Sequence, residues 1–253
     1  MSRKKDNRKL HIIMPMAGEG SRFKNAGYDM PKPLIKFNDK YLFEKSLETI
    51  EGLNYKTLTF VVRKEHIDKY GLDLVILNEY PDANIISVEQ TTRGAAETAF
   101  IAVKYLINTN QADFTDSMLI MDCDVMVNCE EWKAIITRPK FDGVLLSFKS
   151  TDPRYSYADI KHGEVVKTAE KDPISDNALT SPYFIKKIEN FVDAFHDMER
   201  FQEPDGSPTY KEMYVSVLYN FMIANGGHVV LVTTDNITPL GTPEELENAL
   251  KND

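Results

Sequence analysis

Apolar and polar positions follow two patterns along this chain. Residues 11–16 have continuous apolar character, which is typical of a strand buried on both faces of a sheet. Residues 94–107 carry apolar side chains at spacings of four, three and four, the repeat of one helix face, at Ala95, Ala99, Ala102 and Leu106. Short runs of the first kind alternate with longer stretches of the second. This order predicts an α/β fold, Rossmann-like, with helices flanking a mixed, mainly parallel sheet.

The same two patterns divide most of the remaining chain. Further strands are predicted at residues 57–62, 83–88, 117–122, 143–150, 165–169, 179–184 and 228–232. Further helices are predicted at residues 42–50, 188–200, 212–225 and 242–251. The stretch 202–209 contains two prolines and a glycine and is interpreted as a surface loop rather than a domain boundary. We therefore expect a single domain over residues 1–253.

Composition and charge limit which cellular compartment and which kinds of partner we expect for this protein. No apolar run approaches the roughly 20 residues needed to cross a bilayer. Residues 1–9 are basic and are interpreted as a frayed tail, with a nucleic-acid-binding arm as the alternative. The net charge of −9 argues against nucleic acid, because no basic stripe follows the tail. We expect a cytoplasmic protein without nucleic-acid or membrane partners, and its oligomeric state, a homo-oligomer included, stays open.

Cysteine and histidine exclude several other kinds of site. Cys123 and Cys129 are too few for a disulfide framework and wrongly spaced for a zinc site. Both are interpreted as buried or half-buried thiols in a reducing compartment. The five histidines are not clustered with a serine or cysteine motif, so a covalent catalytic triad is not expected.

The strongest chemical motif follows the first predicted strand. Residues 14–23 are Met-Pro-Met-Ala-Gly-Glu-Gly-Ser-Arg-Phe, and residues 31–34 are Pro-Lys-Pro-Leu. Gly18 and Gly20 let backbone N–H groups approach an anion. Arg22 can hold a phosphate through two parallel hydrogen bonds, and Lys32 is a cation pinned between two prolines. Such a set suits charge stabilisation of a transferring phosphoryl group.

Three other interpretations compete for this loop. A dinucleotide-binding loop requires a third glycine where Phe23 stands. A P-loop requires Gly-Lys-Ser or Gly-Lys-Thr, and neither occurs. A structural glycine turn accounts for Gly18 and Gly20 but leaves Arg22 and Lys32 unexplained.

Two further blocks contain polar residues at the ends of predicted strands. Gln90 can both donate and accept hydrogen bonds, as recognition of a base edge requires, and Gly94 opens a helix with nothing bulky to block a base. The alternative is a plain strand-to-helix turn. Asp122 and Asp124 end a buried strand, where ligands collect in parallel sheets, and paired carboxylates suit Mg²⁺. The alternative there is an exposed acidic turn.

These blocks together resemble the signature of the sugar-phosphate nucleotidyltransferases, in which Gly-x-Gly-Ser/Thr-Arg is followed by Pro-Lys-Pro. The residue sequence of the first motif is most similar to the branch found with capsule and surface-polysaccharide genes. Related cytidylyltransferases act on phosphocholine and similar phosphates. The resemblance implies a GT-A-like nucleotidyltransferase fold, Mg²⁺ as the cofactor, and an NTP and a small phosphorylated acceptor as partners. Residues of about 10–150 would form a nucleotide-binding half and residues of about 151–253 an acceptor-binding half.

The resemblance also implies individual roles. The residues that correspond to the nucleotide site are Ala17, Gly18, Glu19, Gly20, Ser21, Gln90 and Gly94. Arg22 would contact the triphosphate, and Lys32 would neutralise the α-phosphate under attack. Asp124 would bind the metal, with Asp122 beside it.

A later block resembles the acceptor segment of the same family. By this resemblance, Glu170 would accept hydrogen bonds from acceptor hydroxyls or an amine, Lys171 would hold the acceptor phosphate, and Tyr183 would line the acceptor pocket. Arg154 stands among aromatic residues upstream. It either lines the same pocket or belongs to a surface turn, and the sequence favours neither.

One departure from the family pattern concerns the metal. Many members carry a second metal-binding aspartate before Gly-Thr-Pro, and Pro239 stands at that position here. Asp235 is the candidate replacement; alternatively, one carboxylate with phosphates and water suffices. The helix start itself survives, with Thr242 as the N-cap, Pro243 as the first residue and Glu245 two positions on.

The expected reaction is a sequential in-line displacement. The acceptor phosphate attacks the α-phosphorus of an NTP, with CTP or UTP favoured, and pyrophosphate leaves. The acceptor is a sugar-1-phosphate, a phosphocholine-like compound or another small phosphate. Two alternatives stay open. One is a GT-A-type glycosyltransferase that uses a nucleotide-sugar. The other is a catalytically impaired NTP-binding regulatory module, because Pro239 stands where a metal-binding aspartate is expected.

Overall fold

The computed structural model describes residues 9–201 and 212–252. Within these ranges the main sheet has nine strands. Its strands are β1 (Leu10–Met16), β4 (Thr57–Arg63), β5 (Asn84–Val88), β6 (Ser117–Ile120), β8 (Gly143–Lys149), β9 (Ser156–Lys161), β10 (Glu164–Glu170), β11 (Asn177–Ile185) and β12 (Val229–Thr233). Two small ladders join β2 (Lys36–Phe37) to β3 (Lys40–Tyr41) and β7 (Val125–Val127) to β13 (Ile237–Pro239).

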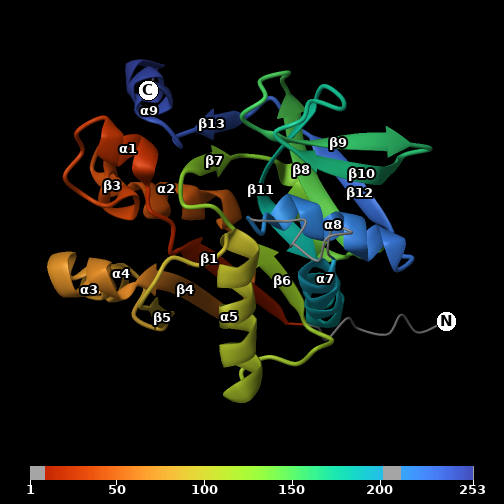
Figure 1. Cartoon of the computed structure of the whole chain (residues 1–253), viewed down its shortest axis with the longest axis horizontal. Coiled ribbons are helices and arrows are strands. Elements are labelled where there is room, and N and C mark those ends of the chain that lie inside the picture. The colour runs from red at the N-terminus through yellow and green to blue at the C-terminus, as the bar shows by residue number, and fades with distance from the viewer. Residues whose placement is uncertain (1–8, 202–211, 253) are drawn as a thin grey trace.

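Helices cover the sheet on both faces (Figure 1). The α-helices are α1 (Ser21–Asn25), α2 (Leu42–Leu47), α3 (Lys64–Tyr70), α4 (Leu72–Glu79), α5 (Ala95–Asn108), α6 (Glu130–Thr137), α7 (Ile188–Arg200), α8 (Val215–Ala224) and α9 (Pro243–Asn252). Two 3₁₀ turns, η1 (Lys32–Leu34) and η2 (Glu48–Ile50), complete the described elements.

The order of the strands brings four carboxyl ends to one edge. β1 pairs in parallel with β4 and β6, and β5 pairs in parallel with β4. β11 runs antiparallel to both β6 and β8 and extends the sheet toward β9 and β10. The loops that follow β1, β4, β5 and β6 therefore emerge at the same edge, where ligands bind in such sheets. The predicted class, a mixed sheet flanked by helices, is confirmed.

The core has two main clusters on either side of β1, whose alternate side chains point to opposite faces. A third, smaller cluster includes Phe23, Phe37 and Leu246. Ile13 packs with α5, α7 and α8 in one cluster. Ile12 and Met14 pack with α2, α4 and α6 in the other, which includes Trp132, a side chain only 1% exposed. The first strand is thus buried on both faces, as its continuous apolar character predicts.

Several elements escape the periodicity analysis. Residues 64–79 form two helices, α3 and α4, because Gly71 takes a φ of 62° between them and each helix is too short to show a clear repeat. α6 and β9 are likewise unpredicted. The strand predicted at 117–122 ends at Ile120, and the helix predicted at 212–225 begins at Val215. The interpretations of residues 1–8 and 202–209 lie outside the described residues.

A polar cluster lies at the opposite, amino-terminal edge of the sheet. His11 is fully buried, and its Nδ1 lies 2.8 Å from Thr57 Oγ1. Its Nε2 lies 3.2 Å from Asp116 Oδ2, and this carboxylate also accepts hydrogen bonds from the backbone N–H groups of Lys9 and Asp113. The cluster joins β1 to β4 and to the start of β6, so we expect it to stabilise the fold.

We expect His11→Gln to lower stability and to weaken its dependence on pH. Burial lowers the pKa of His11 below 6.5 despite the neighbouring Asp116, so the folded state holds the neutral ring. The contribution of His11 is complete above the unfolded-state value of 6.5 and is lost as the pH falls toward the folded-state value. Removing the ring leaves polar partners unsatisfied, at a cost of about 1–3 kcal/mol.

Thermal unfolding between pH 5 and pH 8 checks this expectation. The pKa of His66 is also lowered by burial, so the profile of the variant should become shallower without becoming flat. A variant whose slope equals that of the wild type would show that His11 does not contribute to acid sensitivity.

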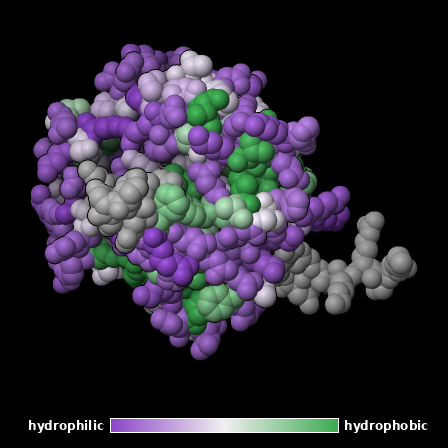
Figure 2. Space-filling view, turned by 45° about the vertical axis from the view of Figure 1, so that its right-hand side comes forward, coloured by the Kyte–Doolittle hydropathy of each residue, from purple (hydrophilic) through white to green (hydrophobic). Residues whose placement is uncertain are grey.

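The hydropathy of the outer surface is consistent with the absence of a long apolar run in the sequence. Figure 2 shows a largely hydrophilic face on which hydrophobic side chains form separate patches. In the part of the chain that the structure describes, no helix combines the length and apolar character needed to span a membrane.

Candidate active site

The glycine loop packs directly on Lys32. β1 ends at Met16, and the following loop turns into α1 through Gly20, which has a φ of 63°. A Cβ atom at Gly20 would lie 3.2 Å from the Cβ of Lys32. Gly20 is therefore required both by its positive φ and by this close approach. The two parts of the first motif, in contact through residues twelve positions apart in sequence, form one structure.

Lys32 forms an ion pair with Asp124. The lysine begins η1 between Pro31 and the buried Pro33, and its Nζ contacts Asp124 Oδ2. Burial lowers the pKa of Lys32, but the adjacent carboxylate of Asp124 outweighs it and raises the pKa to about 12. The lysine is therefore a fixed positive charge, held at the carboxyl edge of the sheet.

Asp122 and Asp124 lie in the loop between β6 and β7. The backbone N–H of Asp122 donates to Ser181 Oγ at 2.7 Å, which ties this loop to β11. Burial and then the charge of Asp124 raise the pKa of Asp122 to about 7. Cys123 between them is buried, which raises the pKa of its thiol to about 12 and keeps it neutral. Cys129 is a half-buried free thiol, so both cysteines have the predicted state.

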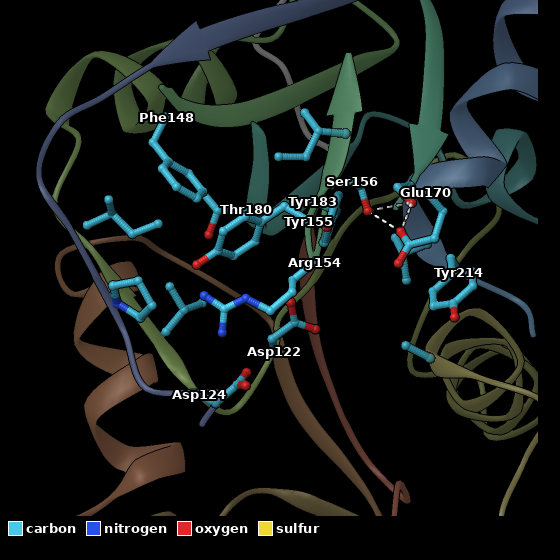
Figure 3. Close-up of a pocket in the computed structure, with 18 of the residues that line it drawn as sticks. Asp122, Asp124, Phe148, Arg154, Tyr155, Ser156, Glu170, Thr180, Tyr183 and Tyr214 are labelled. Atoms are coloured by element: carbon cyan, nitrogen blue, oxygen red, sulfur yellow. Dashed lines mark hydrogen bonds between the residues drawn. The ribbon is translucent and has the colours of Figure 1, made fainter. Parts of the chain in front are cut away.

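A cavity of about 230 Å³ opens beside the two aspartates (Figure 3). The residues expected at the site that line it are Arg22, Asp122, Asp124, Arg154, Glu170 and Tyr183. Lining residues that the sequence analysis did not select include Phe148, Tyr155, Ser156, Thr180, Tyr214 and Glu245. The cavity thus joins residues from both halves of the chain.

Arg154 lies in an exposed turn before β9 and also lines this cavity, so it has features of both interpretations of its block. Its Nε donates to Asp152 Oδ2 at 2.8 Å, and its Nη2 also lies 2.8 Å from that oxygen. Figure 3 shows the guanidinium extending toward Asp122 and Asp124, with the ring of Tyr155 above it. Asp152 thereby holds an exposed cation at the wall of a cavity that Arg22 also lines.

Glu170 occupies the opposite end of the cavity. Its Oε2 accepts hydrogen bonds from Ser156 on β9 and from Ser216 on α8, the latter at 3.2 Å (Figure 3). Tyr183 on β11 also lines the cavity and is 8% exposed, and burial raises the pKa of its phenol well above the ordinary value. This end of the cavity therefore offers fixed carboxylate and hydroxyl groups.

Several expected site residues do not line the cavity, among them Lys171, Asp235 and Gln90. Lys171 lies at its rim, where its Nζ donates to Tyr214 at 2.5 Å and lies 3.8 Å from Glu170 Oε1. Asp235 is exposed in the turn between β12 and β13. Gln90 is exposed between β5 and α5. In residues 9–201 and 212–252, no group of three or more His, Cys, Asp and Glu side chains is arranged to hold a metal ion.

The C-terminal segment is attached to the Asp124 loop. Pro239 pairs with Val125 in the ladder between β13 and β7, and the N–H of Leu240 donates to the carbonyl of Asp124 at 2.7 Å. α9 then begins as predicted, because Thr242 Oγ1 accepts the N–H of Glu245 at 3.2 Å. The Glu245 side chain lines the cavity, a role that its place in the predicted capping sequence gave no reason to expect.

Gly94 is a glycine for a different reason than expected. It has a φ of 146°, and a Cβ atom there would lie 2.5 Å from the carbonyl oxygen of Met213. The same carbonyl accepts the N–H of Ala96 at 3.0 Å. The space beside Gly94 is thus taken by the chain before α8, and this contact, rather than an open path for a base, requires the glycine.

We expect Gly94→Ala to reduce the free energy of unfolding by about 1–3 kcal/mol, because the added methyl group displaces a backbone segment. Gly18→Ala is the matched control. A Cβ atom at Gly18 has no described neighbour within 4 Å, so its effect should stay within about 0.5 kcal/mol. Urea unfolding of both variants tests this, and equal effects would contradict it.

Comparisons with known proteins bear on the fold and the family. No protein-family profile matches the chain, and no curated protein does. A solved structure of a nucleoside-diphosphate-sugar pyrophosphorylase from Vibrio cholerae RC9 is 26% identical, with a TM-score of 0.81, over 95% of this chain and 99% of that one. This similarity supports the resemblance to the sugar-phosphate nucleotidyltransferases.

Two more distant structures share the fold. A putative glucose-1-phosphate thymidylyltransferase from Bacillus anthracis is 17% identical, with a TM-score of 0.74, over 96% of this chain and 94% of that one. An inositol-1-phosphate CTP transferase from T. maritima is 15% identical, with a TM-score of 0.72, over 97% of each chain. The fold of the chain is therefore that of the nucleotidyltransferases.

Proposed function

We propose that this protein is a nucleotidyltransferase that moves an NMP group from an NTP to a small phosphorylated acceptor and releases pyrophosphate. The observation that carries the proposal is the contact of the glycine loop with Lys32, which in turn pairs with Asp124 beside the cavity. A loop for phosphates, a fixed cation and two carboxylates are thereby assembled at the ligand-binding edge of the sheet. The similarity to a pyrophosphorylase supports the same activity.

In this proposal, one half of the chain binds the nucleotide and the other half binds the acceptor. Residues of about 10–150 bind the nucleotide through the loop from Ala17 to Arg22, with Gln90 near the base. Residues of about 151–253 bind the acceptor through Arg154, Glu170 and Tyr183. The proposed acceptor is small, such as a sugar-1-phosphate or a phosphocholine-like compound. CTP or UTP is the proposed donor, and surface-polysaccharide synthesis the proposed setting.

The residues present fit a magnesium ion. Asp122 and Asp124 supply only oxygen donors, the kind that Mg²⁺ prefers. Burial, and then the charge of Asp124, raise the pKa of Asp122 to about 7, while Lys32 lowers it. These two aspartates would hold the ion, which would neutralise phosphate charge when bound. Glu170 lies at the far end of the cavity and is assigned to the acceptor.

The chemical step needs no protein nucleophile. An oxygen of the acceptor phosphate forms a bond to the α-phosphorus of the NTP, and the bond from that phosphorus to the bridging oxygen breaks, so that pyrophosphate leaves. Lys32 neutralises the charge that grows on the α-phosphate, and Arg22 holds the triphosphate in line. Arg154, which lines the cavity, is the proposed cation for the acceptor phosphate, and Lys171 lies at the rim beside Glu170.

Pyrophosphate release is the direct test of this function. The purified protein is incubated with each of four NTPs and a panel of phosphate esters in the presence of Mg²⁺. We expect release with CTP or UTP and with one class of acceptor. Transfer from a nucleotide-sugar without pyrophosphate would favour a glycosyltransferase, and NTP binding without turnover would favour a regulatory module.

A further inference from the structure

Glu245 lies where three parts of the cavity meet. It belongs to the first turn of α9, and its side chain is 17% exposed. Its Oε1 accepts a hydrogen bond from the hydroxyl of Tyr155 at 3.1 Å. A Cβ atom at Gly241 would lie 3.3 Å from Glu245 Oε2 and 2.6 Å from Asp124 Oδ2. The side chain therefore lies between the Asp124 loop and the start of β9.

The same carboxylate faces Arg154. Glu245 Oε1 lies 3.7 Å from Nη1 of the arginine, while Asp152 engages Nε and Nη2. The two acids thus contact different nitrogen atoms of the guanidinium. Arg154 is nearly half exposed, so its side chain needs such contacts to remain over the cavity.

We infer that Glu245 is a positioning residue for acceptor binding. It holds Nη1 of Arg154 on the cavity side, while Asp152 holds the rest of the guanidinium, so that the arginine is oriented before an acceptor phosphate arrives. Preorganisation of this kind lowers the entropic cost of binding. The inference rests on the proposed function, because it assigns the acceptor phosphate to Arg154.

A competing assignment makes Glu245 a metal ligand. It would then replace the aspartate that Pro239 displaces. The contacts favour the positioning role, because the Oε1 atom of Glu245 is already shared between Tyr155 and Arg154. The two roles predict effects on different substrates. Loss of a metal ligand weakens the binding of Mg²⁺ and NTP, whereas loss of the positioning contact weakens the binding of the acceptor.

The test compares Glu245→Gln with Glu247→Gln, which removes the same charge from an exposed position of α9. In steady-state assays of pyrophosphate release, Glu245→Gln should raise the KM for the acceptor about tenfold, the change expected from the loss of one charge-assisted contact. The KM for NTP and the Mg²⁺ dependence should stay constant, and Glu247→Gln should match the wild type.

A binding measurement separates failure of this inference from failure of the proposed function. Calorimetric titration with inorganic phosphate should show about tenfold weaker binding for Glu245→Gln and for Arg154→Gln. The double variant should be no weaker than Arg154→Gln alone, because the two residues act through one contact. If the wild type released no pyrophosphate, the proposed function would fail while this titration still tested Glu245.

Three results would overturn the inference. The first is an additive effect of the two substitutions, and the second is no effect of Glu245→Gln on phosphate affinity. The third is a rise in the Mg²⁺ requirement and in the KM for NTP with the acceptor KM unchanged, which would identify Glu245 as a metal ligand. Circular dichroism of each variant confirms that the comparison is made between folded proteins.

Discussion

Lys32→Ala is expected to lower kcat by about 10²–10³, the range found when one preorganised group that stabilises a developing charge is removed. The structure holds the Nζ of Lys32 against Asp124 and packs the glycine loop on its Cβ, so the ammonium is preorganised and loses little entropy in reaching a phosphate. Its pKa of about 12 keeps it charged across the working range of pH. Single-turnover measurements of pyrophosphate formation with saturating substrates report this step.

Lys36→Ala is the matched control for Lys32. Lys36 is exposed on β2, close in sequence and equal in charge, and should leave kcat unchanged. If Lys32→Ala raised only the KM for NTP, with kcat intact, Lys32 would contribute equally to the bound substrate and to the transition state. The proposed neutralisation of the α-phosphate would then be wrong.

Asp124→Asn should reduce kcat/KM by roughly 10² or more and raise the Mg²⁺ concentration needed for half-maximal activity. The substitution keeps the shape of the side chain and the backbone carbonyl that accepts from Leu240, but it removes the charge that pairs with Lys32. One carboxylate fewer also weakens the proposed ion site, where loss of a supporting group typically costs about 10–100-fold in metal affinity or activity. A titration of activity against Mg²⁺ measures both effects.

Asp235→Asn is the comparison for Asp124→Asn, because it tests whether Asp235 also contributes a carboxylate to the proposed metal site. Asp235 is exposed and away from the cavity, so its substitution should leave activity and Mg²⁺ dependence at the wild-type level. A loss similar to that of Asp124→Asn would restore Asp235 as the replacement for the aspartate absent at Pro239. The pair therefore decides which acidic residue the site uses.

Elements with strong periodicity could be predicted because local sequence alone determines their pattern. β1 is buried at five of its seven positions, and the Ala99, Ala102 and Leu106 face of α5 packs on the sheet. β7 and β13 could not be predicted in the same way. Each is three residues long, and their pairing depends on a contact between segments more than 100 residues apart. Short segments of this kind acquire their structure from tertiary contacts rather than from propensity.

The site was predictable in parts for the same reason. Motifs that are compact in sequence, such as the loop before Arg22 and the Asp122–Asp124 pair, identify their chemistry directly. The position of Arg154 could not be decided, because it depends on Asp152 and on Glu245, which lies 91 residues further along the chain. Lys171 has the residue type expected of a phosphate ligand, but its φ of 54° and its hydrogen bond to Tyr214 place it at the rim.

The burial of Trp132 has a practical consequence for all of these measurements. It is the single tryptophan of the chain, it projects from α6 into the core, and it does not line the cavity. Its fluorescence should therefore report the integrity of the core and stay unaffected when a nucleotide or an acceptor binds. A blue-shifted emission spectrum recorded in the assay cuvette distinguishes a variant that has lost its chemistry from one that has lost its fold.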